Sequence, residues 1–350
     1  MAEQMREENV DAPVVLSVQG LVKNFRVVRR AGLRAHTETV HAVDGIELEV
    51  RAGETLGLAG ESGCGKTTAG RAILRLVEPT SGEIHLSGND LRLANGEALR
   101  RMRRDIGIVF QDPFAAFDPR AMIGDIVSEP LRAHRLCTNR DEAWRQAGVL
   151  LERVGLPAAV VSRFPHEFSG GQRQRIGIAR AIATQPKLII LDEPISALDV
   201  SIRAQILNLL QELQEERGIA YLFIAHDLSV LRHFCHRIAI MYLGVIVEQG
   251  PVEQVFQQPL HPYTMALLDA APELDASRRK KRVIAEGDVP SALHIPSGCR
   301  FRTRCPMAKE RCVNEVPQLK TYGGAHLAAC HFAGDWLTKS DGAGEGRPEA

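Results

Sequence analysis

Alternating hydrophobic and polar residues predict a series of strands in the chain. Residues 14–28 and 42–50 alternate as half-buried strands do, and the polar, basic stretch 29–41 between them predicts a loop. Shorter runs that are apolar throughout indicate strands buried on both faces. These runs are residues 55–59, 106–110, 188–191 and 219–225.

Segments with helical periodicity lie between these strands. Residues 200–217 place their apolar side chains on one face, and Gly218 supplies a stop signal. Residues 68–76 and 172–183 predict two more helices, and residues 113–168 show a mostly helical pattern. Strands that alternate with helices in this way indicate a parallel α/β sheet.

After Gly250 the pattern gives way to a tail punctuated by proline. Within it the basic run 277–282 predicts a solvated linker, and residues 338–350 predict disorder. The sequence contains no internal repeat, so we expect one copy of each motif per chain.

Length, charge and hydropathy restrict the kind of protein. A chain of 350 residues favours one large domain with an appendage. The formal net charge of +0 does not favour a nucleic-acid-binding protein. Residues 1–11 are polar and predict no signal peptide, and the longest apolar stretch, 238–247, is too short to span a bilayer. We therefore expect a soluble chain that reaches a membrane only through a partner.

A glycine-rich segment directly follows the predicted strand 55–59. Residues 60–67 read GESGCGKT, a pattern in which glycines let backbone N–H groups converge on phosphate oxygens. Lys66 would supply charge to the β- and γ-phosphates, and Thr67 would bind Mg²⁺. The flanking strand and helix make a chance glycine turn the less favoured interpretation. The predicted nucleotide contacts are Gly60, Ser62, Gly63, Cys64, Gly65, Lys66, Thr67 and Thr68.

Two acidic residues end the predicted strand 188–191. A carboxylate at the end of a buried strand beside a phosphate loop suits Mg²⁺ coordination, which we assign to Asp192. Glu193 is then the candidate general base for the attacking water. An acidic pair alone is commonplace after a strand, so this prediction depends on the phosphate loop.

A third motif lies between these two. Residues 168–172 read FSGGQ, and Ser169 with the amides of Gly170 and Gly171 would form an anion site at a helix N-terminus. A plain helix cap has the same sequence. Together, however, the three motifs resemble the ABC ATPase family, whose signature these residues match with Phe168 where leucine is commoner. The resemblance makes Ser169, Gly170, Gly171 and Gln172 nucleotide contacts.

Four further positions resemble functional residues of that family. Gln111 resembles the glutamine that touches Mg²⁺ and the attacking water, and His226 the switch histidine at the γ-phosphate. Asp199 ends the segment 196–199, which resembles the loop that crosses the dimer interface. Phe25 occupies the place of the aromatic residue that stacks on adenine, although a core residue is an equal alternative. The resemblance thus implies catalysis by Glu193, His226, Gln111 and Lys66, and Mg²⁺ binding by Thr67, Gln111 and Asp192.

The resemblance also implies a fold and an assembly. The fold class is α/β: a RecA-like P-loop core with an antiparallel β subdomain, an inserted helical subdomain and a small C-terminal cysteine-rich domain. The expected divisions are a flexible N-terminus (1–13), a cassette (14–250, helical subdomain about 113–180), an extension (251–337) and a disordered tail (338–350). In this family the phosphate loop of one cassette faces the signature of another, so one cassette per chain implies a homodimer or a heterodimer.

Four cysteines cluster in the tail: Cys299, Cys305, Cys312 and Cys330. Without an export signal a reducing compartment is expected, which favours a metal site over disulfides. Their spacings match neither the usual zinc pairs nor the common ferredoxin pattern. Some relatives resemble iron–sulfur proteins in this tail, so a [4Fe–4S] cluster is the leading hypothesis, with zinc or four free thiols as alternatives.

The tail indicates which branch of the family the chain resembles. Residues 250–271 and the cysteine cluster resemble the extension of peptide and nickel importer subunits. The expected function is the ATP-hydrolysing motor of an oligopeptide or dipeptide importer, at the cytoplasmic face of the plasma membrane. The expected partners are a second ATPase subunit, two membrane permease subunits docking near residues 111–119 and Phe114, and indirectly an external solute-binding protein. A motor for nickel or another small solute, a soluble ABC ATPase unlinked to transport, and a non-catalytic regulator are the alternatives.

Overall fold

A computed structural model of the chain describes residues 12–31, 34–112, 116–270 and 290–335. Two compact units are present. The first comprises Met1–Leu21, Glu47–Leu56 and Thr67–Ala225, and the second comprises Val22–Ile46, Gly57–Lys66 and His226–Ala350. Strand β3 (Thr55–Ala59), which is buried throughout, contributes to both.

The first unit contains the predicted parallel sheet. Its strand order is β3-β8-β7-β6, with β6 at Ile106–Val109, β7 at Leu188–Asp192 and β8 at Ala220–Ile224. β7 runs parallel to both neighbours. Every residue of β7 and β8 is buried, because strands covered on both faces need apolar side chains on both.

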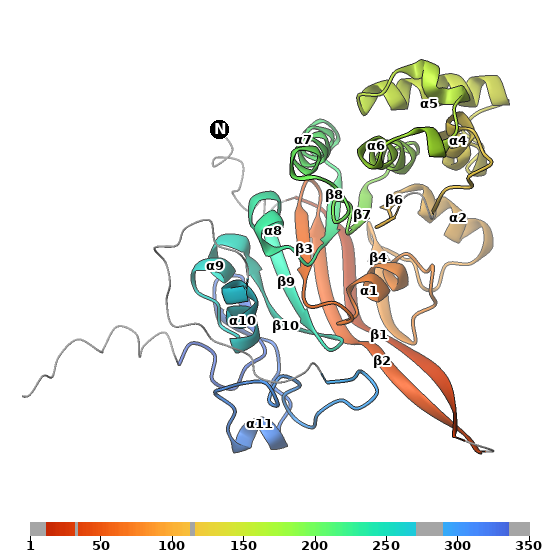
Figure 1. Cartoon of the computed structure of the whole chain (residues 1–350). Helices are drawn as coiled ribbons and strands as arrows, with labels where there is room; N and C mark the ends of the chain where they lie inside the picture. The colour runs from red at the N-terminus through yellow and green to blue at the C-terminus, as the bar shows by residue number, and fades with distance from the viewer. Residues whose placement is uncertain (1–11, 32–33, 113–115, 271–289, 336–350) are drawn as a thin grey trace, which may run out of the picture. The chain divides into compact units, whose positions relative to one another are not determined.

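Helices account for most of the rest of the first unit. They are α1 (Lys66–Ile73), α2 (Gly96–Arg104), α4 (Ile123–Ala133), α5 (Arg140–Arg153), α6 (Gly170–Ala181) and α7 (Val200–Arg217), with short 3₁₀ turns at Ala158–Ser162 and Pro165–Glu167. α4, α5 and α6 pack on one another (Figure 1). In the described parts of the chain, every helix is too short or too polar to cross a bilayer.

Two helices, α6 and α1, lie about two residues earlier in the sequence than the predicted 172–183 and 68–76. α6 begins at Gly170 rather than at residue 172, because Ser169 caps it. α1 ends at Ile73 rather than at residue 76, and Arg75 just beyond it adopts a left-handed conformation with φ 51°. α7 spans the predicted residues and stops at Gly218, whose φ of 64° is typical of a helix terminator.

The loop predicted at residues 29–41 is wrong. β1 extends over Val14–Ala31 and β2 over Arg34–Arg51, in a sheet of order β2-β1-β4-β5 that also contains β4 (Ser81–Leu86) and β5 (Asn89–Asp90). Figure 1 shows β1 and β2 continuing together as a long two-stranded ribbon. Among the described side chains of this part of β2, His36, Thr37 and Thr39 are exposed, so successive positions on both faces meet solvent. Such a strand needs no apolar alternation, and the sequence pattern does not reveal it.

The second unit is built on antiparallel strands. β9 (Arg237–Tyr242) pairs with β10 (Val245–Pro251), β10 with β12 (His326–Ala328), and β12 with β11 (Lys320–Gly323). Strands from the proline-rich tail therefore extend the sheet that β9 and β10 begin. The short helices of this unit are α8 (Leu228–Phe234), α9 (Val252–Gln257), α10 (Pro262–Ala270) and α11 (Glu310–Asn314). The predicted linker at 277–282 and tail at 338–350 lie outside the described residues.

A buried carboxylate anchors the C-terminal segments in the second unit. Glu248 on β10 is 0% exposed and accepts hydrogen bonds from the backbone N–H groups of Leu260 (2.7 Å) and His261 (2.8 Å). The His326 ring on β12 lies 2.8 Å from the same carboxylate. A buried charge needs such partners, so Glu248 fixes the start of α10 and strand β12 to β10.

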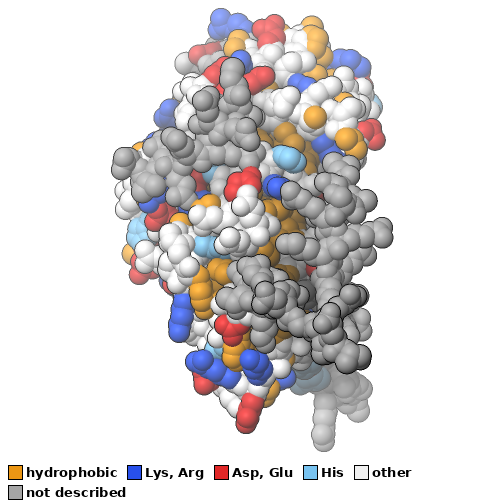
Figure 2. All heavy atoms as spheres, turned by 90° about the vertical axis from the view of Figure 1, so that its left-hand side faces the viewer, with side chains coloured by type: hydrophobic (Ala, Val, Ile, Leu, Met, Phe, Trp, Pro, Cys, Tyr) orange, Lys and Arg blue, Asp and Glu red, His pale blue; other side chains and the backbone are white. Residues whose placement is uncertain are grey.

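Charged side chains of both signs are mixed on the face drawn in Figure 2. Lys and Arg alternate there with Asp and Glu among the described residues, and hydrophobic side chains are exposed between them. This distribution agrees with the formal net charge of +0.

Candidate nucleotide-binding and catalytic site

The phosphate loop follows β3 and belongs, as far as Lys66, to the second unit. Gly60 and Gly65 have φ of 151° and 112°, and a Cβ on either would lie 2.2 Å and 2.1 Å from the carbonyl oxygens of Met241 and Ala42. Glycine is therefore required there by close backbone approach as well as by dihedral angle. Cys64 is buried, and burial raises the pKa of its thiol. Its neutral side chain fills space within the loop.

Lys66 lies across this loop at the start of α1. Its ammonium group donates to the carbonyl oxygens of Gly60 (2.7 Å) and Glu61 (3.0 Å). The side chain is only 5% exposed. A cation held at the N-terminus of a helix, beside converging backbone N–H groups, is suited to receive phosphate oxygens.

The predicted Mg²⁺ ligands Thr67 and Asp192 are in direct contact in the first unit. The Thr67 hydroxyl, in the first turn of α1, donates to Asp192 Oδ1 at 2.9 Å. Asp192 ends β7 and is 3% exposed. A hydroxyl and a carboxylate this close are oxygen ligands that a single Mg²⁺ ion can share.

Glu193 and Gln111 also meet in the first unit. Gln111 Nε2 donates to Glu193 Oε2 at 2.9 Å. The two residues follow β6 and β7, which are parallel neighbours, so their carboxyl ends meet at the same edge. Glu193 has φ 48° and donates its N–H to Ile224 O at 2.9 Å. A non-glycine residue at positive φ is strained, so the surrounding structure holds this carboxylate in place.

The signature motif forms the N-terminus of α6. The Ser169 hydroxyl accepts from the Gln172 N–H at 3.4 Å, and the Gln172 side chain accepts from the Ser169 N–H at 3.0 Å. This reciprocal pair is a capping box. Ser169 and Gly170 are exposed, whereas Phe168 is 5% exposed and packs inward. The motif is thus a helix cap with Ser169 and Gly170 accessible at the helix N-terminus.

Three other predicted site residues, Phe25, His226 and Asp199, are exposed at the surface. Phe25 on β1 is 37% exposed, with Lys23 Nζ 4.8 Å from its ring centroid, so the alternative that it is a core residue is wrong. His226, which follows β8, and Asp199, the N-cap of α7, are both exposed. Part of the predicted docking segment, residues 113–115 with Phe114, lies outside the described residues.

The four tail cysteines line one small cavity of the second unit. The cavity wall also includes His261, Phe301 and His331. Burial raises the pKa of Cys305 to about 11 and that of Cys330 to about 12, so both thiols are neutral without a bound cation. In the described ranges, no group of three or more His, Cys, Asp or Glu side chains is arranged to hold a metal ion. The four cysteines therefore lie around one cavity, but the sequence prediction of a bound metal is not supported in the described residues.

Two contacts of the phosphate loop had no signal in the sequence motifs. The Glu61 side chain pairs with Arg304, and the Glu61 N–H donates to the Tyr263 hydroxyl at 2.8 Å. Glu61 occupies a position of the phosphate-loop pattern that any residue can fill, so the motif gives no reason to single it out.

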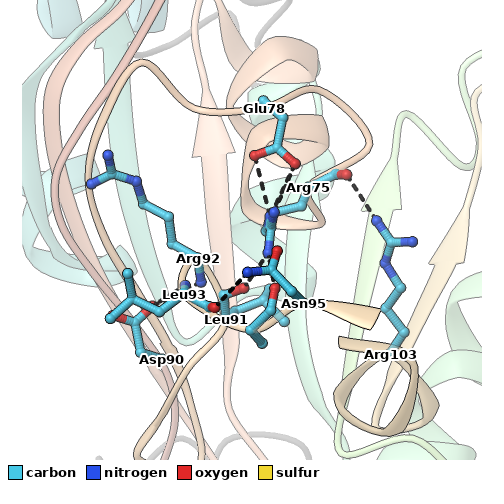
Figure 3. Close-up of polar contacts among 9 residues, drawn as sticks. Arg75, Glu78, Asp90, Leu91, Arg92, Leu93, Asn95 and Arg103 are labelled. Atoms are coloured by element: carbon cyan, nitrogen blue, oxygen red, sulfur yellow. Dashed lines mark hydrogen bonds and ion pairs between the residues drawn. The ribbon is translucent and has the colours of Figure 1, made fainter. Parts of the chain in front are cut away.

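The first unit also fixes the far end of α1 (Figure 3). Arg75 donates to the carbonyl oxygens of Leu91 (2.9 Å) and Ala94 and pairs with Glu78, while its own carbonyl accepts from Arg103 at 2.9 Å. Its side chain is 8% exposed. The helix that begins the nucleotide site is therefore anchored at its other end by a buried guanidinium.

Comparison with known proteins agrees with this geometry. A profile of the ABC transporter family matches residues 43–196, and one described as the oligopeptide/dipeptide transporter C-terminal region matches residues 247–312. The oligopeptide transport ATP-binding protein AppF of Bacillus subtilis is 47% identical over 314 residues, 89% of this chain and 95% of the relative. The oligopeptide transport ATP-binding protein OppF of Salmonella typhimurium is 50% identical over 285 residues, 81% and 85% of the two chains.

A solved structure shares the fold. The ATP-binding cassette MJ0796, in a dimeric post-hydrolysis state bound to ADP and Pi, superposes with a TM-score of 0.58 and 29% identity, covering 68% of this chain and 98% of its own. The matches to AppF and OppF cover most of this chain and most of each relative, so the relationship holds for nearly the whole chain. The chain belongs to the ABC transporter ATP-binding proteins that carry the oligopeptide/dipeptide transporter C-terminal region.

Proposed function

We propose that this chain, an ATPase of the ABC family, is the motor subunit of an importer for oligopeptides or dipeptides. The observation that carries the proposal is the joint presence of the Thr67–Asp192 and Gln111–Glu193 contacts and the matched C-terminal region. The contacts suit hydrolysis, and the C-terminal region favours peptide cargo.

Each site residue has a proposed role in this reaction. Lys66 and the amides of residues 60–68 bind the β- and γ-phosphates, and Phe25 stacks on adenine. Thr67 and Asp192 bind Mg²⁺ with Gln111. Glu193 accepts the proton of the attacking water, and Gln111, hydrogen-bonded to it, helps to place that water.

A second cassette completes the proposed site. Ser169, Gly170, Gly171 and Gln172 offer an anion-binding helix N-terminus to the nucleotide held by a partner cassette, either another copy or a related chain. Asp199 belongs to the crossing loop, and His226 contacts the γ-phosphate. The dimeric state of the MJ0796 cassette supports this arrangement.

The remaining partners follow from the proposed role in import. Two membrane permease subunits would receive the movement, and an external solute-binding protein would deliver the peptide. The chain would then be peripheral to the plasma membrane at its cytoplasmic face. Nucleic acid is not among the proposed partners.

We also propose that Cys299, Cys305, Cys312 and Cys330 hold a [4Fe–4S] cluster. Their convergence on one cavity supports this, because a cluster bound by four thiolates needs all four to face one space. A single zinc ion suits the cavity less, since it requires ligands within about 2.3 Å of one point and the described residues offer no such group. Iron, sulfide and zinc are to be assayed after purification without oxygen. A folded chain free of all three would contradict the cluster and the zinc alternative alike.

Affinity capture of the tagged full chain from native membranes tests the importer role. We expect two multi-span membrane proteins and a second ATPase to be recovered with it, and a Lys66→Ala chain to assemble equally but to support no uptake of labelled oligopeptides. Uptake of nickel instead of peptides would show that the cargo is nickel. Recovery without membrane proteins would overturn the importer role.

A further inference from the structure

Glu61 is the point at which the C-terminal extension contacts the phosphate loop within the second unit. Its backbone N–H donates to the Tyr263 hydroxyl at 2.8 Å, and its carbonyl oxygen accepts from the Lys66 ammonium group at 3.0 Å. Its carboxylate pairs with Arg304. One residue of the loop is therefore held by the extension on one side and holds the phosphate-binding lysine on the other.

The Arg304–Glu61 pair has the geometry of a fixed contact. Arg304 Nη1 lies 2.9 Å and 3.2 Å from the two carboxylate oxygens, and Nη2 lies 3.2 Å from one of them. The Arg304 side chain is 10% exposed and the Glu61 side chain 27%. A forked guanidinium contact of this kind fixes orientation as well as charge, which lysine cannot reproduce.

Packing around this pair holds its partners in place. The rings of Tyr242, Tyr263 and Phe301 lie with centroids 4.6 to 5.4 Å apart, and the Arg304 guanidinium lies 5.9 Å from the Phe301 ring centroid. The Arg304 N–H donates to Phe301 O at 3.0 Å. Tyr242 and Tyr263 come from the two sides of residue 250, so this cluster links strand β9 to the extension.

We propose that Arg304 is a positioning residue for ATP binding: it fixes the phosphate loop through Glu61 and neutralises the one acidic side chain within that loop. Residues 60–67 contain no other acidic residue. An unpaired carboxylate beside the phosphates would repel ATP, and a loop free to shift would hold Lys66 less well. The extension thereby takes part in nucleotide affinity.

The charge argument predicts an asymmetry between the two partners. Arg304→Gln leaves Glu61 negative and unpaired, so we expect the KM for ATP to rise about tenfold with kcat changed less than about twofold. Glu61→Gln leaves the Arg304 cation without its carboxylate partner instead, and we expect the KM for ATP to rise by no more than about threefold. The double variant should resemble Glu61→Gln alone, because removing the carboxylate removes the repulsion.

The experiment measures ATPase kinetics and equilibrium ATP binding for the full chain, with Arg302→Gln as the matched control. Arg302 lies two residues away and donates to Ser297 O in its own segment at 2.8 Å. Thermal unfolding of each variant separates loss of fold from loss of affinity, and Arg304→Lys, which keeps the charge, should be intermediate.

Two results would overturn the proposal. One is an unchanged KM and ATP affinity in folded Arg304→Gln; the other is additivity of the two single changes in the double variant. If Arg304→Gln does not fold, Arg304→Lys is used to test the proposal. A KM for ATP equal to the wild-type value in that variant would then overturn it. The proposal concerns ATP binding and does not depend on the cargo: failure of the wild-type chain to hydrolyse ATP would count against the proposed function instead.

Discussion

At the scale of single residues, the structure gives two adjacent acidic residues different environments. Asp192 is buried and accepts from Thr67, whereas Glu193 turns away at positive φ and accepts from Gln111. The positive φ of Glu193 places the two adjacent carboxylates against different partners. The proposed roles of Asp192 as a Mg²⁺ ligand and Glu193 as the general base rest on these partners.

Replacing Glu193 with Gln tests the general base. The amide keeps the size of the side chain but cannot accept a proton, so we expect turnover to fall by about a hundredfold or more while ATP affinity stays within about threefold of wild type. Phosphate release and nucleotide binding measured on the same preparation check this. Glu212→Gln, on the exposed face of α7, is the control and should be unaffected. Wild-type turnover in the Glu193 variant would remove this residue from the role.

At the scale of elements, α6 and α7 approach each other where the signature begins. A Cβ on Gly171 would lie 2.6 Å from Ile202 Cγ2, whereas a Cβ on Gly170 would meet only Leu198 at an ordinary 3.6 Å. Glycine at 171 is therefore a packing requirement between two helices, and glycine at 170 is not.

This difference predicts opposite outcomes for two neighbouring substitutions. Gly171→Ala should lower the free energy of unfolding by about 1–3 kcal/mol because the methyl group overpacks the helix contact. Gly170→Ala should change it by less than about 1 kcal/mol, since alanine favours the helix and fits the space. Adding Ile202→Ala to the Gly171 variant should restore part of the loss. Equal denaturation midpoints for the two single variants would be the contrary result.

The anchor at the end of α1 also acts between elements. Arg75→Gln leaves the carbonyl oxygens of Leu91 and Ala94 without their donor, and we expect a loss of about 2–4 kcal/mol in the free energy of unfolding. Glu78→Gln removes only the ion pair, whose carboxylate is 65% exposed, and should cost less than about 1 kcal/mol. Chemical denaturation separates the two. Similar losses for both would show that the ion pair, rather than the carbonyl contacts, holds the helix end.

At the scale of the whole molecule, a buried histidine links stability to pH. His261 is 1% exposed, accepts from the Tyr263 N–H through Nδ1 at 3.0 Å, and has its pKa lowered by burial from 6.5 to about 3. Because the folded-state pKa lies below the unfolded one, this contribution to stability is complete above about pH 6.5 and is lost as the pH falls toward 3.

Unfolding measured across this pH range tests the linkage. The His261→Asn variant keeps an acceptor for the Tyr263 N–H and cannot take up a proton. We expect it to be less stable than wild type near pH 8, because the smaller side chain leaves a cavity. As the pH is lowered from 6.5 to 4, its free energy of unfolding should also fall less steeply than that of wild type. The difference in slope should correspond to at most one proton taken up per molecule on unfolding. Equal slopes for the two proteins would show that His261 does not control the acid response.

The sequence alone predicted a phosphate-loop motif in this protein and determined the parallel strands beside it. Glycine spacing, a lysine and strand-ending acids are short-range features, and buried strands reveal themselves by continuous apolar runs. The family resemblance, too, depended on such local motifs. Residues 60–67, Asp192, Glu193 and the stop of α7 at Gly218 were therefore predictable from the order of residues.

Tertiary structure decided what depends on distant contacts. In the β1–β2 ribbon, described residues such as His36, Thr37 and Thr39 are exposed and leave no apolar periodicity, so residues 29–41 were misassigned. Three other features bring together residues that are far apart in the sequence. They are the pairing of β12 with β10, the four cysteines around one cavity, and the contact of Arg304 with Glu61, which lie 243 positions apart. No local pattern encodes such contacts, because they depend on which surfaces meet once the core has formed.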